Sequence, residues 1–229
     1  MPLETLFIAA LGGILPALVW LWFWTKEDRL HPEPRKVLLA AFLGGMIAVP
    51  LVIPLQQYAY DWFGMFPVLL FVIWAGIEEI FKFGASWFFA LKRKVCDEPI
   101  DAMIYLLTTA LGFAALENTL FLLHPLAQGD WTQVILTGNF RFLGASLVHV
   151  VSSTVLGVTL ALSFYKSKTT KIIYGIIGLT TAIALHSWFN LFIIKSTKYP
   201  AFFAFIGVWI AVIMLIVVFE KVKKIYPNQ

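Results

Sequence analysis

The amino-acid sequence predicts an all-α fold, a polytopic membrane helix bundle with about seven transmembrane helices. Of the 229 residues, 60% are hydrophobic and only 13% are charged, and the mean hydropathy is +0.85. That apolar fraction exceeds what the core of a soluble domain could bury. Apolar runs of the ~20 residues that a bilayer requires fill nearly the whole chain, and no linker or low-complexity tract separates them. We therefore expect one transmembrane domain over residues 1–229.

The helices are expected at seven apolar runs, which cover residues 6–24, 37–56, 67–91, 101–123, 140–165, 172–194 and 201–219. Proline is tolerated in the first turn of a helix and disfavoured in its interior. In agreement with these boundaries, Pro99 and Pro200 precede two runs and Pro125 follows one. The first run lacks a basic leader and a small-residue cleavage site, so we expect a retained transmembrane helix rather than a cleaved signal peptide.

Lysine and arginine are distributed unequally between the two sides of the predicted bundle. Thirteen of them flank the first, third and fifth loops and the C-terminal tail, whereas the opposite side has Arg141, Lys195 and Lys198. Because cytoplasmic loops carry the excess of positive charge, the N-terminus is predicted outside and the C-terminus in the cytoplasm. We expect a multi-pass protein of the cell membrane whose basic flanks contact anionic lipid, with no nucleic-acid partner.

Charged side chains interrupt two of the apolar runs, Glu78, Glu79 and Lys82 in one and Glu117 in the next. A charge near the middle of a bilayer costs roughly 2.5 to 3.5 kcal/mol on insertion scales, which makes such residues candidates for a functional site. His149 and His186 lie at a similar depth in two further runs, at mid-membrane or in the outer half. Polar groups from four helices at one depth are typical of a site in a helix bundle.

The spacing of these residues predicts how they face one another. Glu78 and Lys82 are four residues apart on one helix face, so we expect them to pair, with Lys82 as a charge-balancing group. Glu79 lies about 100° away around the helix and should contact another helix. His186 and Asn190 are also four apart, so one face presents an imidazole and a carboxamide together.

Three short motifs follow one another along these runs: EExxK at 78–82, FxxxE at 113–117 and HxxxN at 186–190, with His149 between the second and the third. In this order, on successive apolar helices, they resemble the PrsW family of bacterial intramembrane proteases, which are relatives of the CAAX prenyl endopeptidases. The resemblance covers about residues 67–194. It implies hydrolysis of a peptide bond in a membrane-embedded cavity by a single transmembrane protease domain.

The resemblance also implies a substrate and residue roles. The family's known role is first-site cleavage of a membrane-bound anti-sigma factor on its extracytoplasmic side, which implies a single-spanning membrane protein as substrate. By analogy with the CAAX enzymes, Glu78 would activate a water, and His186 with Asn190 would stabilise the oxyanion. This chain has Glu117 where those enzymes have a histidine, and His149 is the candidate for the missing imidazole. We include Glu79 in the catalytic set.

Two questions remain open in the sequence. There is no HExxH motif, and we expect a metal-free, glutamate-dependent enzyme; the alternative is zinc held by Glu78, Glu117, His149 and His186, since carboxylates and imidazoles are zinc ligands. Buried carboxylates and histidines also occur in proton-coupled transporters, and the wider superfamily includes a non-catalytic scaffold subunit. A transporter or a membrane scaffold is therefore the alternative function.

Overall fold

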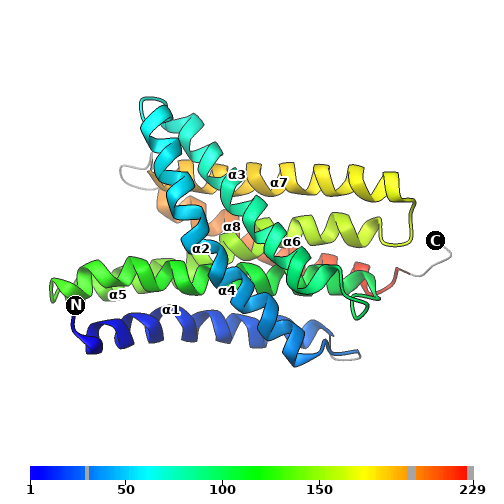
Figure 1. Ribbon diagram of the computed structural model, residues 1–229, viewed down its shortest axis with the longest axis horizontal. Helices are drawn as coiled ribbons and strands as arrows, with labels where there is room; N and C mark the ends of the chain where they lie inside the picture. The colour runs from blue at the N-terminus through cyan, green and yellow to red at the C-terminus, as the bar shows by residue number, and fades with distance from the viewer. Residues whose placement is uncertain (29–30, 195–199, 226–229) are drawn as a thin grey trace.

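The computed structural model describes residues 1–28, 31–194 and 200–225, and within these ranges it contains helices and no strand (Figure 1). The helices are α1 (Leu3–Trp24), η1 (Thr25–Asp28), α2 (Arg35–Phe63), α3 (Pro67–Ser86), η2 (Trp87–Leu91), α4 (Pro99–Ala127), α5 (Trp131–Phe140), η3 (Arg141–Ala145), α6 (Ser146–Leu162), α7 (Lys168–Ile194) and α8 (Pro200–Val222). The predicted all-α polytopic bundle is confirmed.

Six helical stretches of the described chain are long and apolar enough to cross a membrane. They correspond to six of the seven predicted runs. The remaining run, 67–91, forms α3 and η2. Because three of the twenty residues of α3 are charged, its composition alone does not identify it as a membrane-spanning helix. The fifth span begins earlier than predicted, because α5, η3 and α6 continue one another from Trp131 to Leu162. Pro125 lies inside the last turn of α4 rather than beyond its end, which also makes that helix longer than predicted.

Helix α4 forms the centre of the bundle, and it packs against α1, α2 and α6 (Figure 1). Its residues 99–115 are buried around the whole circumference of the helix. Glycine permits the contact with α2, since a Cβ on Gly112 would lie 1.9 Å from the Phe42 carbonyl oxygen and one on Gly45 would lie 1.9 Å from that of Thr109. Such close backbone approach between small residues is characteristic of helix packing in membranes, where dispersion replaces the hydrophobic effect.

Helices α2 and α3 lie side by side and cross the remaining helices obliquely (Figure 1). Helix α3 also contacts α4, α6 and α7. Its charged residues therefore meet the three helices that carry the other polar candidates. The predicted orientation of the bundle stays a prediction, and Arg29, Lys195 and Lys198, which contributed to it, lie outside the described residues.

Candidate active site

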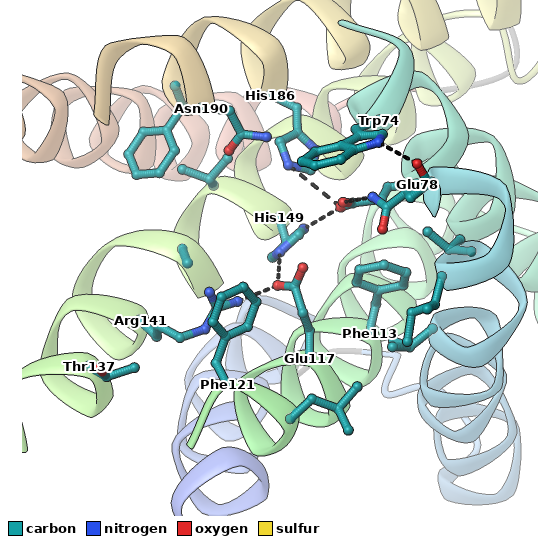
Figure 2. A pocket seen from close by; sticks show the side chains of 18 of the residues that line it. Trp74, Glu78, Phe113, Glu117, Phe121, Thr137, Arg141, His149, His186 and Asn190 are labelled. Carbon is teal, nitrogen blue, oxygen red and sulfur yellow. Dashed lines mark hydrogen bonds and ion pairs between the residues drawn. The ribbon is translucent and has the colours of Figure 1, made fainter. Parts of the chain in front are cut away.

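Four helices bring the predicted polar residues together at one place in the bundle (Figure 2). Helix α3 supplies Glu78 and Glu79, α4 supplies Glu117, α6 supplies His149 and α7 supplies His186. The two imidazole rings meet edge to face, with centroids 5.0 Å apart. Glu78, Glu79, His149 and His186 are all buried, so this part of the cluster is surrounded by protein.

Glu79 is the most heavily bonded carboxylate of this cluster, and it is only 1% exposed. Its Oε1 accepts from Lys82 Nζ at 2.5 Å and from His186 Nδ1 at 2.8 Å. The hydroxyl groups of Ser152 and Ser153 on α6 donate to its two oxygens, at 3.2 and 2.8 Å. The prediction that Glu79 contacts other helices is confirmed, because its partners come from α3, α6 and α7.

The predicted pairing of Lys82 with Glu78 is wrong. The Lys82 ammonium, which is 0% exposed, pairs with Glu79 three residues earlier on the helix and also lies 3.1 Å from His149 Nδ1. Spacings of three and four residues both bring side chains onto one helix face, so sequence alone could not choose between them. The tertiary contacts of Glu79 decide which glutamate Lys82 pairs with, because they bring the buried hydrogen-bond donors together around the Glu79 carboxylate.

Glu78 faces a different way from Glu79. Its Oε1 accepts from the Gln56 side chain at 2.8 Å. Its Oε2 is buried without a hydrogen-bond partner and lies 3.6 Å from His186 Nε2 and 3.8 Å from His149 Nδ1. A water molecule can bridge polar atoms at such separations. Glu78 is thus the carboxylate of this pair that has a free oxygen directed at the imidazoles.

Glu117 lies against His149 and against Arg141, which was predicted only as an outer-side charge at the start of the apolar run 140–165. His149 Nε2 is 3.0 Å from Glu117 Oε2, and the Arg141 guanidinium forms an ion pair with the same oxygen. Arg141 Nε also donates to the Asn118 side chain at 2.5 Å. Arg141 therefore bridges two neighbouring side chains of α4 and holds Glu117 beside the imidazole.

The local backbone explains how Arg141 reaches the site. It begins η3, a π-helical turn inside the continuous stretch from α5 to α6. Such turns shift the register of a helix and are frequent at functional sites. The signal in the sequence was the uncharged segment 131–139, which extends this span and places Arg141 inside the membrane-spanning helix.

A cavity of about 800 Å³ opens onto this cluster (Figure 2). Glu78, Glu117, His149, His186 and Asn190 line it, whereas Glu79 and Lys82 are not among its lining residues and lie behind them. Most of its remaining wall is apolar or aromatic. Polar side chains line the end near the turn between α4 and α5, namely His124, Gln128, Gln133 and Thr137.

The hydrogen bonds assign the imidazole tautomers, because a carboxylate can only accept. His186 donates from Nδ1 to Glu79, which leaves the Nε2 lone pair facing Glu78. His149 donates from Nε2 to Glu117, which leaves the Nδ1 lone pair facing Glu78 and Lys82. Both rings therefore present an acceptor nitrogen to the free oxygen of Glu78.

Glu78, His149 and His186 could hold a metal ion, whereas Glu117, the fourth ligand of the predicted zinc set, is not part of this group. Glu78, His149 and His186 each offer one ligand atom, and these atoms lie within 4.8 Å of one another. Two imidazoles and a carboxylate form a known catalytic zinc set. Each imidazole is also bonded through its other nitrogen to a carboxylate, as metal-binding histidines usually are. The ammonium of Lys82 shares the His149 Nδ1 lone pair and would have to leave it.

The family model described as "PrsW family intramembrane metalloprotease" matches residues 33–219. Relatives called "Protease PrsW" include one from Halalkalibacterium halodurans, 24% identical over 95% of this chain and 97% of the relative. Another, from Geobacillus kaustophilus, is 29% identical over 69% of this chain and 65% of the relative. No solved structure matches. The matched segment contains every residue of the cluster, and the chain therefore belongs to the PrsW family of intramembrane metalloproteases.

Proposed function

We propose that this membrane-embedded peptidase hydrolyses a peptide bond in the cavity between α3, α4, α6 and α7, with Glu78 activating the attacking water. One observation carries the proposal: the free Oε2 of Glu78 lies 3.6 and 3.8 Å from two imidazole nitrogens at the wall of a cavity. A general base needs a free lone pair within reach of a water and of the scissile carbonyl. Glu79 has no oxygen in this position, because its partners occupy both.

Glu78 and His186 would then transfer the proton of the water in two steps, and Asn190 would stabilise the oxyanion. Glu78 accepts a proton from the water as the oxygen attacks the carbonyl carbon, and the adjacent His186 Nε2 takes that proton on. The imidazolium is stabilised by Glu79 at Nδ1, and it can donate from Nε2 to the oxyanion or to the leaving amine. Asn190, in the same cavity wall, supplies a neutral N–H donor for the oxyanion.

Three further residues, Glu117, His149 and Lys82, would position Glu78 and compensate the negative charges around it. Glu117 holds His149 through Nε2, and Arg141 neutralises the charge of Glu117. Lys82 compensates Glu79 behind the cavity, so that Glu78 stays the reactive carboxylate.

The family description implies a metal, and the donor set of Glu78, His149 and His186 fits one. When bound there, a divalent metal would supply Lewis acidity and lower the pKa of a coordinated water. We retain carboxylate activation as the proposal, because the Lys82 ammonium shares His149 Nδ1, and a cation at that nitrogen would face both charge repulsion and the loss of this contact.

The substrate we propose is a single-spanning protein of the cell membrane, such as an anti-sigma factor, cleaved on its extracytoplasmic side. Supporting this, the polar end of the cavity lies at the turn between α4 and α5, which the positive-inside rule places outside. An apolar wall suits a transmembrane segment, and a polar mouth suits the hydrated residues beside it. Family membership favours this reading over a scaffold or a proton-coupled transporter.

The test is cleavage of tagged single-spanning membrane proteins by Glu78→Gln and His186→Ala variants, first by co-expression and then in detergent. Both variants should lose cleavage, since Glu78→Gln keeps the shape and the Gln56 contact but removes the base. Asp61→Asn, an equivalent change at an exposed residue of α2 whose side chain accepts from Gln57, should cleave normally. Normal cleavage by both site variants would refute the assignment.

A further inference from the structure

A second group of acidic side chains lies at the N-terminal end of α4, which is the end opposite to the turn between α4 and α5. Asp28 ends η1, Glu33 precedes α2, and Asp101 lies in the first turn of α4. One carboxylate oxygen from each lies within 4.8 Å of those from the other two. Their exposed fractions are 7%, 9% and 1%. Three buried carboxylates at this spacing repel one another unless a positive charge or protons compensate them.

Two of the three carboxylates are fixed in place by donors of the protein. Asp101 Oδ2 accepts the backbone N–H groups of Asp97 and Glu98, at 2.8 and 2.7 Å, as part of a capping box at the start of α4. Glu33 accepts a hydrogen bond from the hydroxyl of Tyr105, which lies one turn further along α4. The arrangement is therefore built by the fold rather than by loose surface side chains.

Asp28 supplies the independent observation. Its Oδ2 is buried and has no hydrogen-bond partner, although its carboxylate faces those of Glu33 and Asp101. The ion pairs of the described residues include none between these three carboxylates and a lysine or arginine. A buried carboxylate oxygen without a partner costs free energy that a ligand can recover.

We propose that Asp28, Glu33 and Asp101 bind a hard divalent cation, Mg²⁺ or Ca²⁺, which clips the connection between α1 and α2 to the first turn of α4. The donors are oxygens alone, which these ions prefer and which distinguishes this site from the imidazole-containing one around Glu78. Since α4 also carries Glu117, the clip fixes the helix that presents this carboxylate to His149.

The test measures cation binding and not proteolysis, so that it is independent of the proposed function. The parent is the full chain with Glu78→Gln, which removes the carboxylate of the other donor set. After treatment with chelator it is titrated with Mg²⁺ and with Ca²⁺ by calorimetry, and thermal unfolding is followed by tryptophan fluorescence. We expect one equivalent of one of these ions to bind and to raise the unfolding temperature.

Asp28→Asn and Glu33→Gln keep the shape of each side chain and remove its charge. Each should weaken cation binding at least about tenfold, because loss of a residue that merely hydrogen-bonds to a metal ligand already has an effect of this size. Asp61→Asn, the exposed control, should bind as the parent does. Absence of binding to the parent overturns the proposal whether or not the variants fold. Unchanged affinity in both variants overturns it as well. Stabilisation of Asp28→Asn and Glu33→Gln without any response to cations would show instead that the carboxylates share protons.

Discussion

The buried pair of Glu79 and Lys82 offers a quantitative test of how the charges of the site are arranged. Replacing Glu79 with Gln leaves the Lys82 ammonium, which is 0% exposed, without its carboxylate. Breaking a buried ion pair in this way costs about 3–5 kcal/mol of stability, because the remaining charge is uncompensated. In a chain of this size, that corresponds to a fall in unfolding temperature of roughly 6–20 °C.

Glu78→Gln should behave differently, although it makes the same chemical change one residue away. Its Oε2 has no hydrogen-bond partner to lose, and the amide can keep the contact with Gln56. We expect its unfolding temperature to stay close to that of the parent while cleavage is lost. A matched control exists at Glu220, which pairs with Lys223 at the same spacing of three residues but is 58% exposed. Glu220→Gln should leave the unfolding temperature close to that of the parent, because solvent screens an exposed ion pair.

The measurement is thermal unfolding of the purified variants in detergent, followed by the fluorescence of the nine tryptophans. Lys82→Met completes a double-mutant cycle with each glutamate. Its cost should be strongly non-additive with Glu79→Gln and more nearly additive with Glu78→Gln, which meets Lys82 only through their shared neighbour His149. Stronger coupling of Lys82 to Glu78 than to Glu79 would refute the assignment of its partner and with it the separation of a reactive carboxylate from a charge-balancing one.

Three further predictions follow from the site and the topology. Cleavage should survive a chelator; stoichiometric zinc in active protein, lost together with activity, would show that the metal alternative is right. Arg141→Met should lower the cleavage rate by up to about 100-fold, since it releases Glu117 from the position in which it holds His149. In a Cys96→Ala background, a cysteine at Gln128 should be labelled by an impermeant thiol reagent in intact cells, whereas one at Thr169 should be labelled only after lysis; the reverse pattern would overturn the orientation.

The natural Cys96 is unsuitable as the cytoplasmic marker in that experiment. Burial, with the nearby carboxylates of Asp101 and Glu33, raises the pKa of the Cys96 thiol from an ordinary value of 9.0 to about 12. Only the thiolate reacts with such reagents. A rise of this size leaves about a thousandfold less thiolate at neutral pH, so Cys96 should stay unlabelled from either side of the membrane. Rapid labelling of Cys96 in lysed cells would contradict this.

The sequence by itself determined the class of the protein and the candidate residues of its site. Long apolar runs admit few folds other than a helix bundle in a bilayer, since every backbone group must be hydrogen-bonded within its own segment. Charged groups are costly there, so Glu78, Glu79, Lys82 and Glu117 were visible as candidates without any structure. The order of the short motifs indicated the family, which the comparisons confirm over residues 33–219.

The tertiary structure decided which charge meets which. Helical spacing allowed Lys82 to reach either glutamate, and the contacts of Glu79 with α6 and α7 resolved that choice. The sequence indicated Arg141 only as an outer-side charge at the start of the run 140–165, and the structure shows that the π-helical turn places it against Glu117. The reason is common to both cases: periodicity fixes the face on which a side chain lies, but the packing of neighbouring helices fixes what that face touches. Helix packing in this bundle therefore leaves one oxygen of Glu78, and none of Glu79, free at the cavity.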